Sequence, residues 1–321
     1  MQVLVTGGAG FIGSHLVDRL LDEGHRVTVL DDLSTGTVDN IGHHLGNDRL
    51  RLVVGSILDR ATLEPLVQQA DQVYHLAALV GVKRVVDDPL AGILTNVQGT
   101  ENVLALAYKY WVPVLIASSS EVYGKSVDLP FREDGEIVLG PTTVPRWSYA
   151  HSKALDEHLA LAYARKGLPV VIVRYFNAYG PRTDPRGYGS VVARFIAQAL
   201  RGDPITVYDD GQQTRCFTYV ADTVWGTILA AQTPKAQGRV FNIGRDQETS
   251  ILELARLVRR MTGSTSEIVH IPYRDAYGPN FEESRRRVPD TRRAREVLGF
   301  QAGTSLEDGL KATIAWFQER G

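Results

Sequence analysis

The chain has 321 residues, of which 44% are hydrophobic and 22% charged, and its formal net charge is −2. These values describe a globular protein that can bury a sizeable core, as one large domain or two modest ones. The balanced charge excludes the strongly basic surface that nucleic acid or an anionic membrane would require. A single cysteine, Cys216, excludes a disulfide framework and a cysteine-rich metal site. No apolar run reaches the roughly 18 residues of a transmembrane helix, so we expect a soluble, cytoplasmic protein.

Short apolar runs alternate with amphipathic stretches through the first half of the chain. The expected strands are Gln2–Val5, Arg26–Leu30, Leu50–Val54, Gln72–His75, Val112–Ala117 and Val170–Arg174. The expected helices are Phe11–Asp22, Arg60–Gln69, Pro89–Tyr110 and Tyr149–Lys166. Repeated strand–helix–strand units have right-handed crossovers, which place parallel strands in one sheet with helices on both faces. The sequence therefore predicts an α/β fold with a Rossmann-type, doubly wound parallel sheet.

After Arg174 the alternation loosens. Residues 179–189 form a turn-rich loop, and residues 273–290 are irregular and rich in arginine. Ser250 and Glu253 form a capping box. The expected helices in this half are Val191–Leu200, one from Ser250 to about Met261, and Ser305–Glu319. We expect a first domain over 1–175, which also receives segments around 218–245, and a smaller mixed α/β lobe over 176–321, interleaved with the first.

The first strand is followed by a glycine-rich turn and then by a helix. Gly7, Gly10 and Gly13 give the pattern G-x-x-G-x-x-G, and Gly8, Gly10 and Gly13 also satisfy G-x-G-x-x-G. Without side chains the backbone can turn tightly and approach a pyrophosphate, whose charge then lies at the amino end of the helix that begins at Phe11. In this strand–turn–helix context the pattern predicts a dinucleotide site.

The second strand ends at Asp31 and Asp32. A carboxylate at this position can accept hydrogen bonds from both ribose hydroxyls and repels a 2′-phosphate, so we expect NAD rather than NADP. We favour Asp31 as the ribose ligand, with Asp32 as the alternative. Ile57 is expected beside the adenine, and Ala77 and Ala78 leave room for the backbone of the cofactor.

Tyr149 and Lys153 are four residues apart and therefore lie on one face of a helix. Oxidation of a secondary alcohol needs a base for the hydroxyl proton, and a tyrosine with its ordinary pKa of about 10 needs a shift of roughly 2–3 units to act near neutrality. We expect Lys153 and the positive nicotinamide ring to supply that shift. Ser119, at the end of the fifth strand, is expected to hydrogen-bond the same substrate oxygen.

Several motifs together resemble the extended short-chain dehydrogenase/reductase superfamily, over essentially the whole chain. They are the glycine turn, Ser-Ser-Ser-x-Val-Tyr-Gly over 118–124, Tyr-x-x-x-Lys over 149–153 and Arg-Tyr-Phe-Asn over 174–177. Members of this superfamily are 4-epimerases, dehydratases and decarboxylases of nucleotide-diphosphate sugars. The resemblance therefore implies a UDP-sugar substrate and also implies that Phe11, Ile12 and Tyr175 contact NAD.

Within that superfamily the chain most resembles the UDP-glucuronate decarboxylases. The similar segments are Pro-Arg-Trp-Ser-Tyr over 145–149, Thr-Arg-Cys-Phe-Thr over 214–218, Ala-Tyr-Gly-Pro over 276–279 and Arg-Val-Pro-Asp over 287–290. In that branch a glutamate and an arginine take part in decarboxylation, and Glu121 and Arg287 match them. Oxidation at C4 would make a β-keto acid, whose C6 carboxylate leaves as CO2, and C5 is then reprotonated through Glu121 or a water that it holds.

Other activities of the superfamily compete with this interpretation. The main alternative is a UDP-sugar 4-epimerase, in which the oxidised sugar rotates and hydride returns to its other face. A 4,6-dehydratase normally has an aspartate where this chain has Ser120, and an apiose synthase has a cysteine there. A nucleotide-sensing regulator without catalysis would not need both Tyr149 and Lys153.

The resemblance also implies a set of substrate contacts. Arg215 and Arg287 are expected on the diphosphate or the substrate carboxylate, because guanidinium groups bind such oxygens bidentately. Arg182 or Arg186 is a candidate for the C6 carboxylate. The remaining expected contacts are Ser120, Asn177, Val191, Tyr208 on the uracil and Tyr277 on the sugar. Family members commonly pair as homodimers, here through the helices Pro89–Tyr110 and Tyr149–Lys166.

Overall fold

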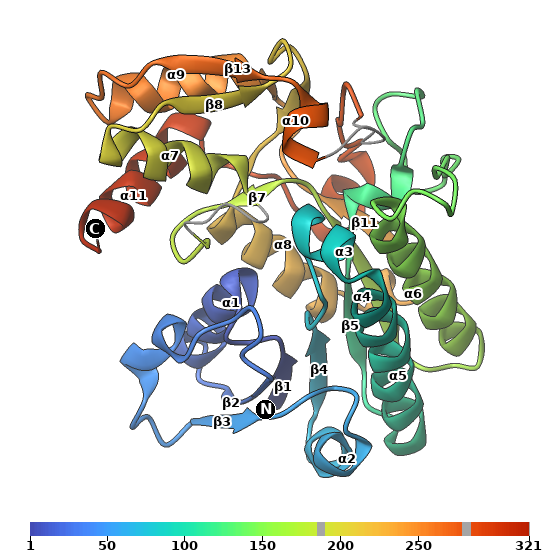
Figure 1. Cartoon of the computed structure of the whole chain (residues 1–321). Coiled ribbons are helices and arrows are strands. Elements are labelled where there is room, and N and C mark those ends of the chain that lie inside the picture. Colours follow the sequence, from blue (N-terminus) through green and yellow to red (C-terminus); the bar gives the residue numbers. More distant parts are fainter. Residues whose placement is uncertain (185–189, 278–283, 321) are drawn as a thin grey trace.

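A parallel sheet of seven strands forms the larger part of the molecule, in the order β11-β6-β5-β4-β1-β2-β3. The computed structural model describes residues 1–184, 190–277 and 284–320 (Figure 1). In chain order the strands of this sheet are β1 Gln2–Thr6, β2 Arg26–Asp31, β3 Leu50–Val54, β4 Gln72–His75, β5 Val114–Ser119, β6 Val170–Tyr175 and β11 Arg239–Ile243. The predicted α/β fold with a doubly wound parallel sheet is confirmed.

Helices cover both faces of this sheet (Figure 1). On one face lie α1 Phe11–Asp22 and α8 Val220–Gln232, whose Leu16 and Val224 share a core cluster with Val3 and Val5 of β1. On the other face lie α2 Arg60–Gln68, α5 Gly99–Tyr110 and α6 Trp147–Arg165, which share a second cluster with Leu4. Successive side chains of a strand point to opposite faces, so β1 contributes to both clusters.

A smaller lobe lies beyond the carboxyl ends of the strands (Figure 1). Its helices are α7 Val191–Arg201, α9 Ile251–Met261 and α11 Leu306–Gln318, which pack around a third core cluster. They accompany the parallel pair β8 Ile205–Tyr208 and β13 Ile268–Ile271. The predicted capping box begins α9, because Ser250 Oγ accepts from the Glu253 amide and the Glu253 side chain accepts from the Ser250 amide.

The chain of the small lobe returns to the large sheet at α8 and β11, which lie in the sequence between β9 Thr214–Cys216 and β12 Glu248–Ser250 of the lobe. The segment around 218–245 contains both of these elements. The domain boundary near residue 175 stays a prediction. The two further strand pairs are β7 Ala178–Tyr179 with β10 Thr218–Tyr219, and β9 Thr214–Cys216 with β12 Glu248–Ser250.

The fifth strand and the expected helix Pro89–Tyr110 differ from the observed elements. The fifth strand begins at Val114 rather than Val112, because Pro113 has no N–H to contribute to the ladder. The expected helix Pro89–Tyr110 is divided into α4 Pro89–Ile93, a π-helical segment Leu94–Gln98 and α5. Within this segment the Asn96 side chain accepts from the Leu79 amide at 2.8 Å and donates to Ser152 Oγ at 3.0 Å. A π-helical turn inside a helix is often found near a functional site.

One further helix boundary and several short elements complete the fold. The first turn of α6 begins at Trp147, two residues before the expected start. α10 Tyr273–Tyr277 lies in the segment expected to be irregular, and α3 Val82–Asp87 was not expected. Single helical turns occur at Val38–Asn40, Gly42–His44, Ser120–Tyr123, Pro234–Ala236 and Ala294–Leu298. Among the described residues, no helix combines the length and the apolar character needed to cross a bilayer.

Candidate active site

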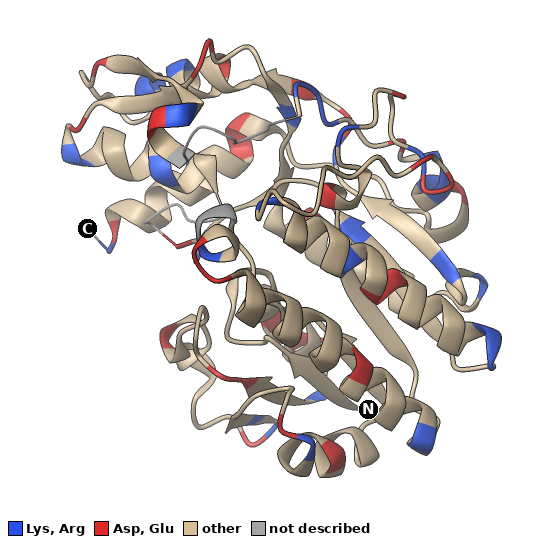
Figure 2. Cartoon of the chain, turned by 45° about the vertical axis from the view of Figure 1, so that its right-hand side comes forward, with Lys and Arg blue, Asp and Glu red and all other residues tan. Residues whose placement is uncertain are grey.

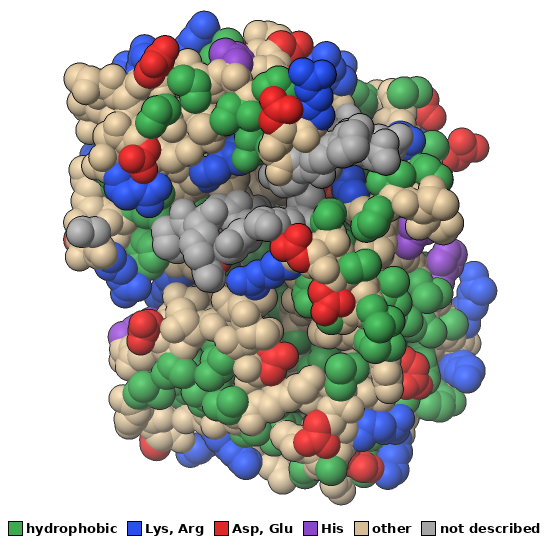
Figure 3. Space-filling view, viewed as in Figure 1, with side chains coloured by type: hydrophobic (Ala, Val, Ile, Leu, Met, Phe, Trp, Pro, Cys, Tyr) green, Lys and Arg blue, Asp and Glu red, His purple; other side chains and the backbone are tan. Residues whose placement is uncertain are grey.

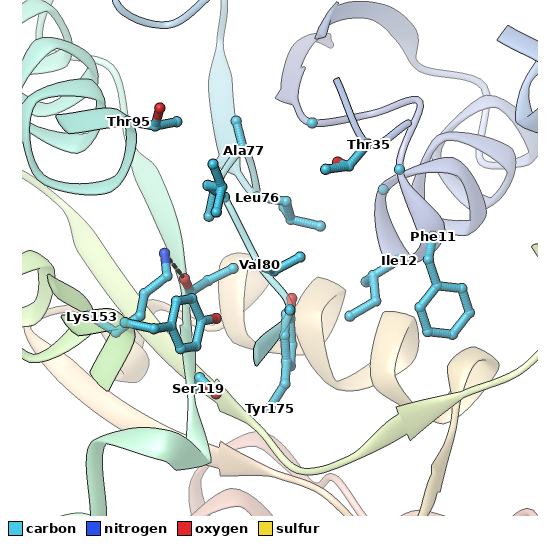
Figure 4. A pocket seen from close by; sticks show the side chains of 18 of the residues that line it. Phe11, Ile12, Thr35, Leu76, Ala77, Val80, Thr95, Ser119, Lys153 and Tyr175 are labelled. Carbon is cyan, nitrogen blue, oxygen red and sulfur yellow. Dashed lines mark hydrogen bonds between the residues drawn. The ribbon is translucent and has the colours of Figure 1, made fainter. Parts of the chain in front are cut away.

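A cavity of about 560 Å³ opens at the carboxyl ends of β1, β2, β4 and β5, where a doubly wound sheet binds its ligands. The residues predicted to bind the cofactor all line it, namely Gly7, Gly10, Phe11, Ile12, Gly13, Asp31, Asp32, Ile57, Ala77, Ala78, Tyr149, Lys153 and Tyr175. It is also lined by the predicted catalytic or substrate residues Ser119, Ser120, Glu121, Asn177 and Arg287. In Figure 4, Lys153 and Ser119 lie on one side of this space, and Phe11 and Ile12 on the other.

The glycine turn is packed too tightly for side chains at two positions. A Cβ on Gly13 would lie 2.1 Å from the Gly7 carbonyl oxygen, and one on Gly7 would lie 2.7 Å from the Ala77 amide nitrogen. Gly7 also has a φ of +74°, which glycine adopts readily. This turn brings backbone amides to the amino end of α1, so the residues present fit the pyrophosphate of a dinucleotide.

Asp31 is buried at the end of β2, and its carboxylate lies in the cavity wall. Its oxygens accept from the amides of Ala9 and Leu33, both at 2.9 Å. Burial raises its pKa despite these hydrogen bonds. Each oxygen keeps a lone pair for a ribose hydroxyl. Asp32, which also lines the cavity, accepts from the amide and hydroxyl of Ser34 on a single oxygen, at 3.0 and 2.6 Å. The choice of Asp31 over Asp32 as the ribose ligand stays a prediction.

Lys153 is buried on α6 with its ammonium held on two sides. Nζ donates to the carbonyl oxygen of Ala117 at 3.1 Å and to Asp156 Oδ2 at 3.2 Å. The bond to Ala117 ties α6 to the end of β5, which also carries Ser119 (Figure 4). Sequence analysis had no role for Asp156.

Tyr149 shares a hydrogen bond with the Ser119 hydroxyl. Burial raises the pKa of Tyr149 well above its ordinary value, the charge of Glu121 raises it further, and the bond to Ser119 opposes both. The expected lowering of this pKa is therefore not produced by the protein alone. A positive nicotinamide ring beside Tyr149 would act in the opposite direction and lower this pKa.

Glu121 lies between two guanidinium groups. Arg287 Nη1 donates to its Oε1 at 2.6 Å, and Arg146 Nη1 donates to its Oε2 at 3.3 Å. Burial by itself would raise the pKa of Glu121, but Arg287 and Arg146 outweigh it and lower the pKa to about 2. Glu121 is therefore a carboxylate at every physiological pH, suited to holding a water or a cation rather than to donating a proton.

The sequence did not predict the position of Arg146 or the buried oxygen of Asn177. Arg146 is buried, lines the cavity and stacks on Trp147 at 4.5 Å, yet sequence analysis gave it no role. Its position three residues before Tyr149 was the available signal, because residues spaced by three share a helix face. Asn177, which was predicted, has a buried Oδ1 that has no hydrogen-bond partner within the described part of the chain. Such an atom is suited to a ligand donor.

Other predicted substrate residues do not line this cavity. Arg182 pairs with Asp18 at 2.7 Å, and the other Asp18 oxygen accepts from His43 and His44, so this guanidinium stabilises α1 instead of facing Glu121. Arg215 is buried on β9, close enough to Glu121 to help lower its pKa.

The last substrate predictions fall in the small lobe. Val191 begins α7, and the Arg194 guanidinium covers the Tyr208 ring at 4.1 Å. Tyr277 ends α10, but its side chain and the whole of Arg186 are outside the described residues.

The chain is similar to a known protein family and to individual members of it. A model described as the NAD dependent epimerase/dehydratase family matches residues 3–244. The chain belongs to this family. The resemblance to extended short-chain dehydrogenases/reductases is thereby confirmed, and NAD is the cofactor, as the glycine turn and Asp31 predict. The protein is an NAD-dependent enzyme of this family.

Individual relatives of this family cover the whole chain. UDP-N-acetyl-alpha-D-glucosaminuronate decarboxylase of Bacillus cytotoxicus is 48% identical over 99% of the chain and 98% of its own length. UDP-glucuronic acid decarboxylase 1 of Xenopus tropicalis is 38% identical over 99% of the chain and 72% of its own length. The crystal structure of UDP-glucuronic acid 4-epimerase from Bacillus cereus, with UDP-glucuronic acid and NAD, is 32% identical, with a TM-score of 0.90 over 100% of both chains.

Proposed function

We propose that the protein is an NAD-dependent UDP-glucuronate decarboxylase. The observation that carries this proposal is Glu121, held between Arg287 and Arg146 in the cavity that Tyr149 and Lys153 also line. Relatives at 48% and 38% identity are named as decarboxylases of UDP-linked uronic acids, which supports the same reaction.

The proposed reaction begins at C4 of the sugar. Tyr149, ionised when the positive cofactor is present, takes the C4 hydroxyl proton, while Ser119 hydrogen-bonds the same oxygen. When bound, NAD supplies the acceptor and later the donor of the C4 hydride. The C5–C6 bond of the 4-keto acid then breaks, which releases CO2 and leaves the electron pair as an enolate whose oxygen at C4 is stabilised by Tyr149 and Ser119.

The second half of the reaction restores the ring. C5 takes a proton from a water held by Glu121, since Glu121 itself stays ionised. Return of the hydride to C4 and of a proton to the oxygen on C4 yields UDP-xylose. In sum, UDP-glucuronate and one proton give UDP-xylose and CO2.

Two arginines are available for the anionic groups of the substrate. We assign Arg146 and Arg287 to the C6 carboxylate, because both lie against a carboxylate already and both line the cavity. Arg215, with Asn177, remains the proposed contact of the diphosphate. Tyr208 remains the proposed partner of the uracil, and Val191 and Tyr277 remain proposed substrate contacts.

Incubation of the purified protein with UDP-glucuronate tests the proposal. We expect CO2 and a product whose mass is lower by that of CO2. A product of unchanged mass would instead establish the 4-epimerase alternative, which similarity to UDP-glucuronic acid 4-epimerase keeps open. Turnover of UDP-glucose or UDP-galactose without any turnover of UDP-glucuronate would also contradict the proposal.

A second candidate substrate is UDP-N-acetylglucosaminuronate, which the name of the relative at 48% identity favours. The substituent at C2 takes no part in the bond changes at C4, C5 and C6, so both sugars can follow the same steps. Parallel assays at equal concentration decide between them, and the sugar with the higher kcat/KM is the substrate.

We also propose that two copies pair through α4, α5 and α6. Exposed apolar side chains gather on these helices and on the π-helical segment between α4 and α5, namely Leu90, Ile93, Leu94, Tyr108 and Leu155. Few charges interrupt the two long helices in Figure 2, and hydrophobic side chains gather over this region in Figure 3. A second copy would cover them, with α5 and α6 of both copies in one four-helix interface. A cytoplasmic location is proposed from the single, buried Cys216.

A further inference from the structure

Lys153 has a buried counter-charge one helical turn away. The side chains of Lys153 and Asp156 are 4% and 0% exposed, and their charged groups are 3.2 Å apart. The other carboxylate oxygen, Asp156 Oδ1, has no hydrogen-bond partner among the described residues. Lys153 is therefore the charged partner of Asp156. Burial raises the pKa of Asp156, whereas the charge of Lys153 and the side chains of Lys153 and Thr100 lower it.

The neighbouring carboxylates pair with arginines. Glu157, the next residue on α6, accepts two hydrogen bonds from Arg174 of β6, at 2.8 and 2.6 Å, and one from the Ser118 hydroxyl at 2.5 Å. Glu121 is held by Arg287 and Arg146.

Uncharged neighbours complete the surroundings of the pair. His75 of β4 is neutral, because burial and the charge of Lys153 lower its pKa to about 3, and it hydrogen-bonds the Thr100 hydroxyl of α5 at 3.0 Å. Within the described chain, Asp156 is thus the carboxylate that compensates Lys153.

We propose that Asp156 is a positioning residue that keeps Lys153 protonated beside Tyr149 while the positive cofactor occupies the site. This inference rests on the proposed role of Tyr149 as the base. A buried ammonium without a counter-charge loses its proton readily, and a second positive charge nearby increases that tendency. A neutral Lys153 would no longer help Tyr149 to ionise.

The direct effect of Asp156 on Tyr149 has the opposite sign. Its negative charge raises the pKa of Tyr149, but less than burial and the charge of Glu121 do. Removal of Asp156 therefore distinguishes the two effects by direction. If Asp156 mainly holds the proton on Lys153, its removal slows the reaction, whereas if its direct effect dominates, removal extends activity to lower pH.

The first test is the pH dependence of C4 oxidation in D156N, followed by reduced-nicotinamide absorbance with a UDP-sugar that the wild type oxidises. We expect D156N to lose at least about tenfold in rate near pH 8 and to decline as the pH rises, because Lys153 deprotonates in the working range. D156E keeps the charge and restores the wild-type profile. T100V, which removes a neighbouring hydroxyl without changing the charge, keeps that profile too. An unchanged D156N profile, or one extended to lower pH, overturns the inference.

The second test is independent of any substrate. Thermal unfolding is measured for K153M, D156N and the double variant K153M/D156N. Each single variant leaves one buried charge alone, so we expect its melting temperature to fall by about 5–15 °C, and the double variant to recover most of that loss.

The outcomes of this cycle separate the two proposals. If the two losses of melting temperature add up in the double variant, the inference is overturned. It is also overturned if neither D156N nor the double variant folds. Recovery of folding in the double variant when D156N alone does not fold supports it. A wild type inactive on UDP-glucuronate would contradict the proposed function and leave this thermal cycle as the test of the ion pair.

Discussion

At the scale of single residues, the chemistry depends on the protonation state of Tyr149. The sequence identifies Tyr149 and Lys153 as a pair because their spacing on a helix is fixed. It cannot show that burial and Glu121 raise the pKa of Tyr149, because those effects depend on contacts between distant segments. In the protein alone, these effects favour the neutral phenol of Tyr149.

Arg146 had no predicted role, and its position in the cavity suggests that it binds the substrate carboxylate. We expect Arg146→Met to raise the KM for UDP-glucuronate by about 10–100-fold, which corresponds to the roughly 1.5–3 kcal/mol of a hydrogen bond to a charged group. The affinity for NAD should not change. Steady-state kinetics and NAD titration check both values. Arg146→Lys serves as the matched control, because it keeps the charge but loses the planar fork. Equal KM values for wild type and Arg146→Met would disprove the assignment.

His75 makes the stability of the protein depend on pH. Its pKa is lowered to about 3 in the folded protein, first by burial and then by Lys153, whereas the unfolded chain has the ordinary value of 6.5. Below about pH 6.5 the unfolded state binds a proton at His75 that the folded state does not bind. The free energy of unfolding therefore falls as the pH drops from about 6.5 to about 3, by up to roughly 1.4 kcal/mol per pH unit.

Denaturant unfolding at a series of pH values measures this slope. The variant His75→Gln, whose amide can still bond to Thr6 and Thr100, should show a slope reduced by about one proton. If its slope equals that of the wild type, His75 is not the titrating group.

At the scale of elements, local signals determine how well a segment can be predicted. The bounds of α1, β3 and β4 agree with those expected, because α1 ends close to Gly24, β3 ends just before Gly55 and β4 begins just after Asp71. β5 is displaced by two residues because Pro113 was counted in the strand. The π-helical segment in the α4–α5 region was missed because Asn96 bonds to Leu79 and Ser152, and neither contact has a local sequence signal.

The glycine turn allows a direct test at this scale. A methyl group on Gly13 would overlap the Gly7 carbonyl, so Gly13→Ala should weaken NAD binding by at least about tenfold and destabilise the β1–α1 turn by roughly 1–3 kcal/mol. Gly303→Ala is the control, because a methyl group there meets nothing within 4 Å. Fluorescence titration with NAD and thermal unfolding give the two values. Wild-type affinity in Gly13→Ala would show that the turn can relax without cost to the site.

At the scale of the whole molecule, the site joins residues far apart in the chain. Glu121 and Arg287 are separated by 166 positions, and only family resemblance connected them beforehand. Asp156 was missed although it lies one turn from Lys153, because an acidic residue near a helical lysine is usually solvated. Because both side chains are buried, Asp156 and Lys153 instead form an ion pair that is shielded from solvent. The pairing of Arg182 with Asp18 could not be foreseen, because a loop arginine has no local signal for its partner.

The proposed pairing of two copies is also tested at this scale. Leu94 is 44% exposed on the apolar face, so Leu94→Glu should convert a dimer into a monomer, because a buried charge without a partner is costly. Val127 is 87% exposed on a loop elsewhere, and Val127→Glu should leave the assembly intact. Analytical ultracentrifugation measures the mass of each variant. A monomeric wild type would contradict the pairing directly.

The central claim is that Tyr149-dependent oxidation at C4 precedes loss of the C6 carboxylate. One single-turnover measurement tests it, in which the protein with bound NAD is mixed with UDP-glucuronate labelled at C6. Reduced-nicotinamide absorbance and labelled CO2 are followed together, in the wild type and in Tyr149→Phe. The account predicts that absorbance rises before or with the release of CO2, and that both slow by about 10²–10⁴-fold in the variant. Release of CO2 without any reduction, or equal rates in both proteins, would contradict it.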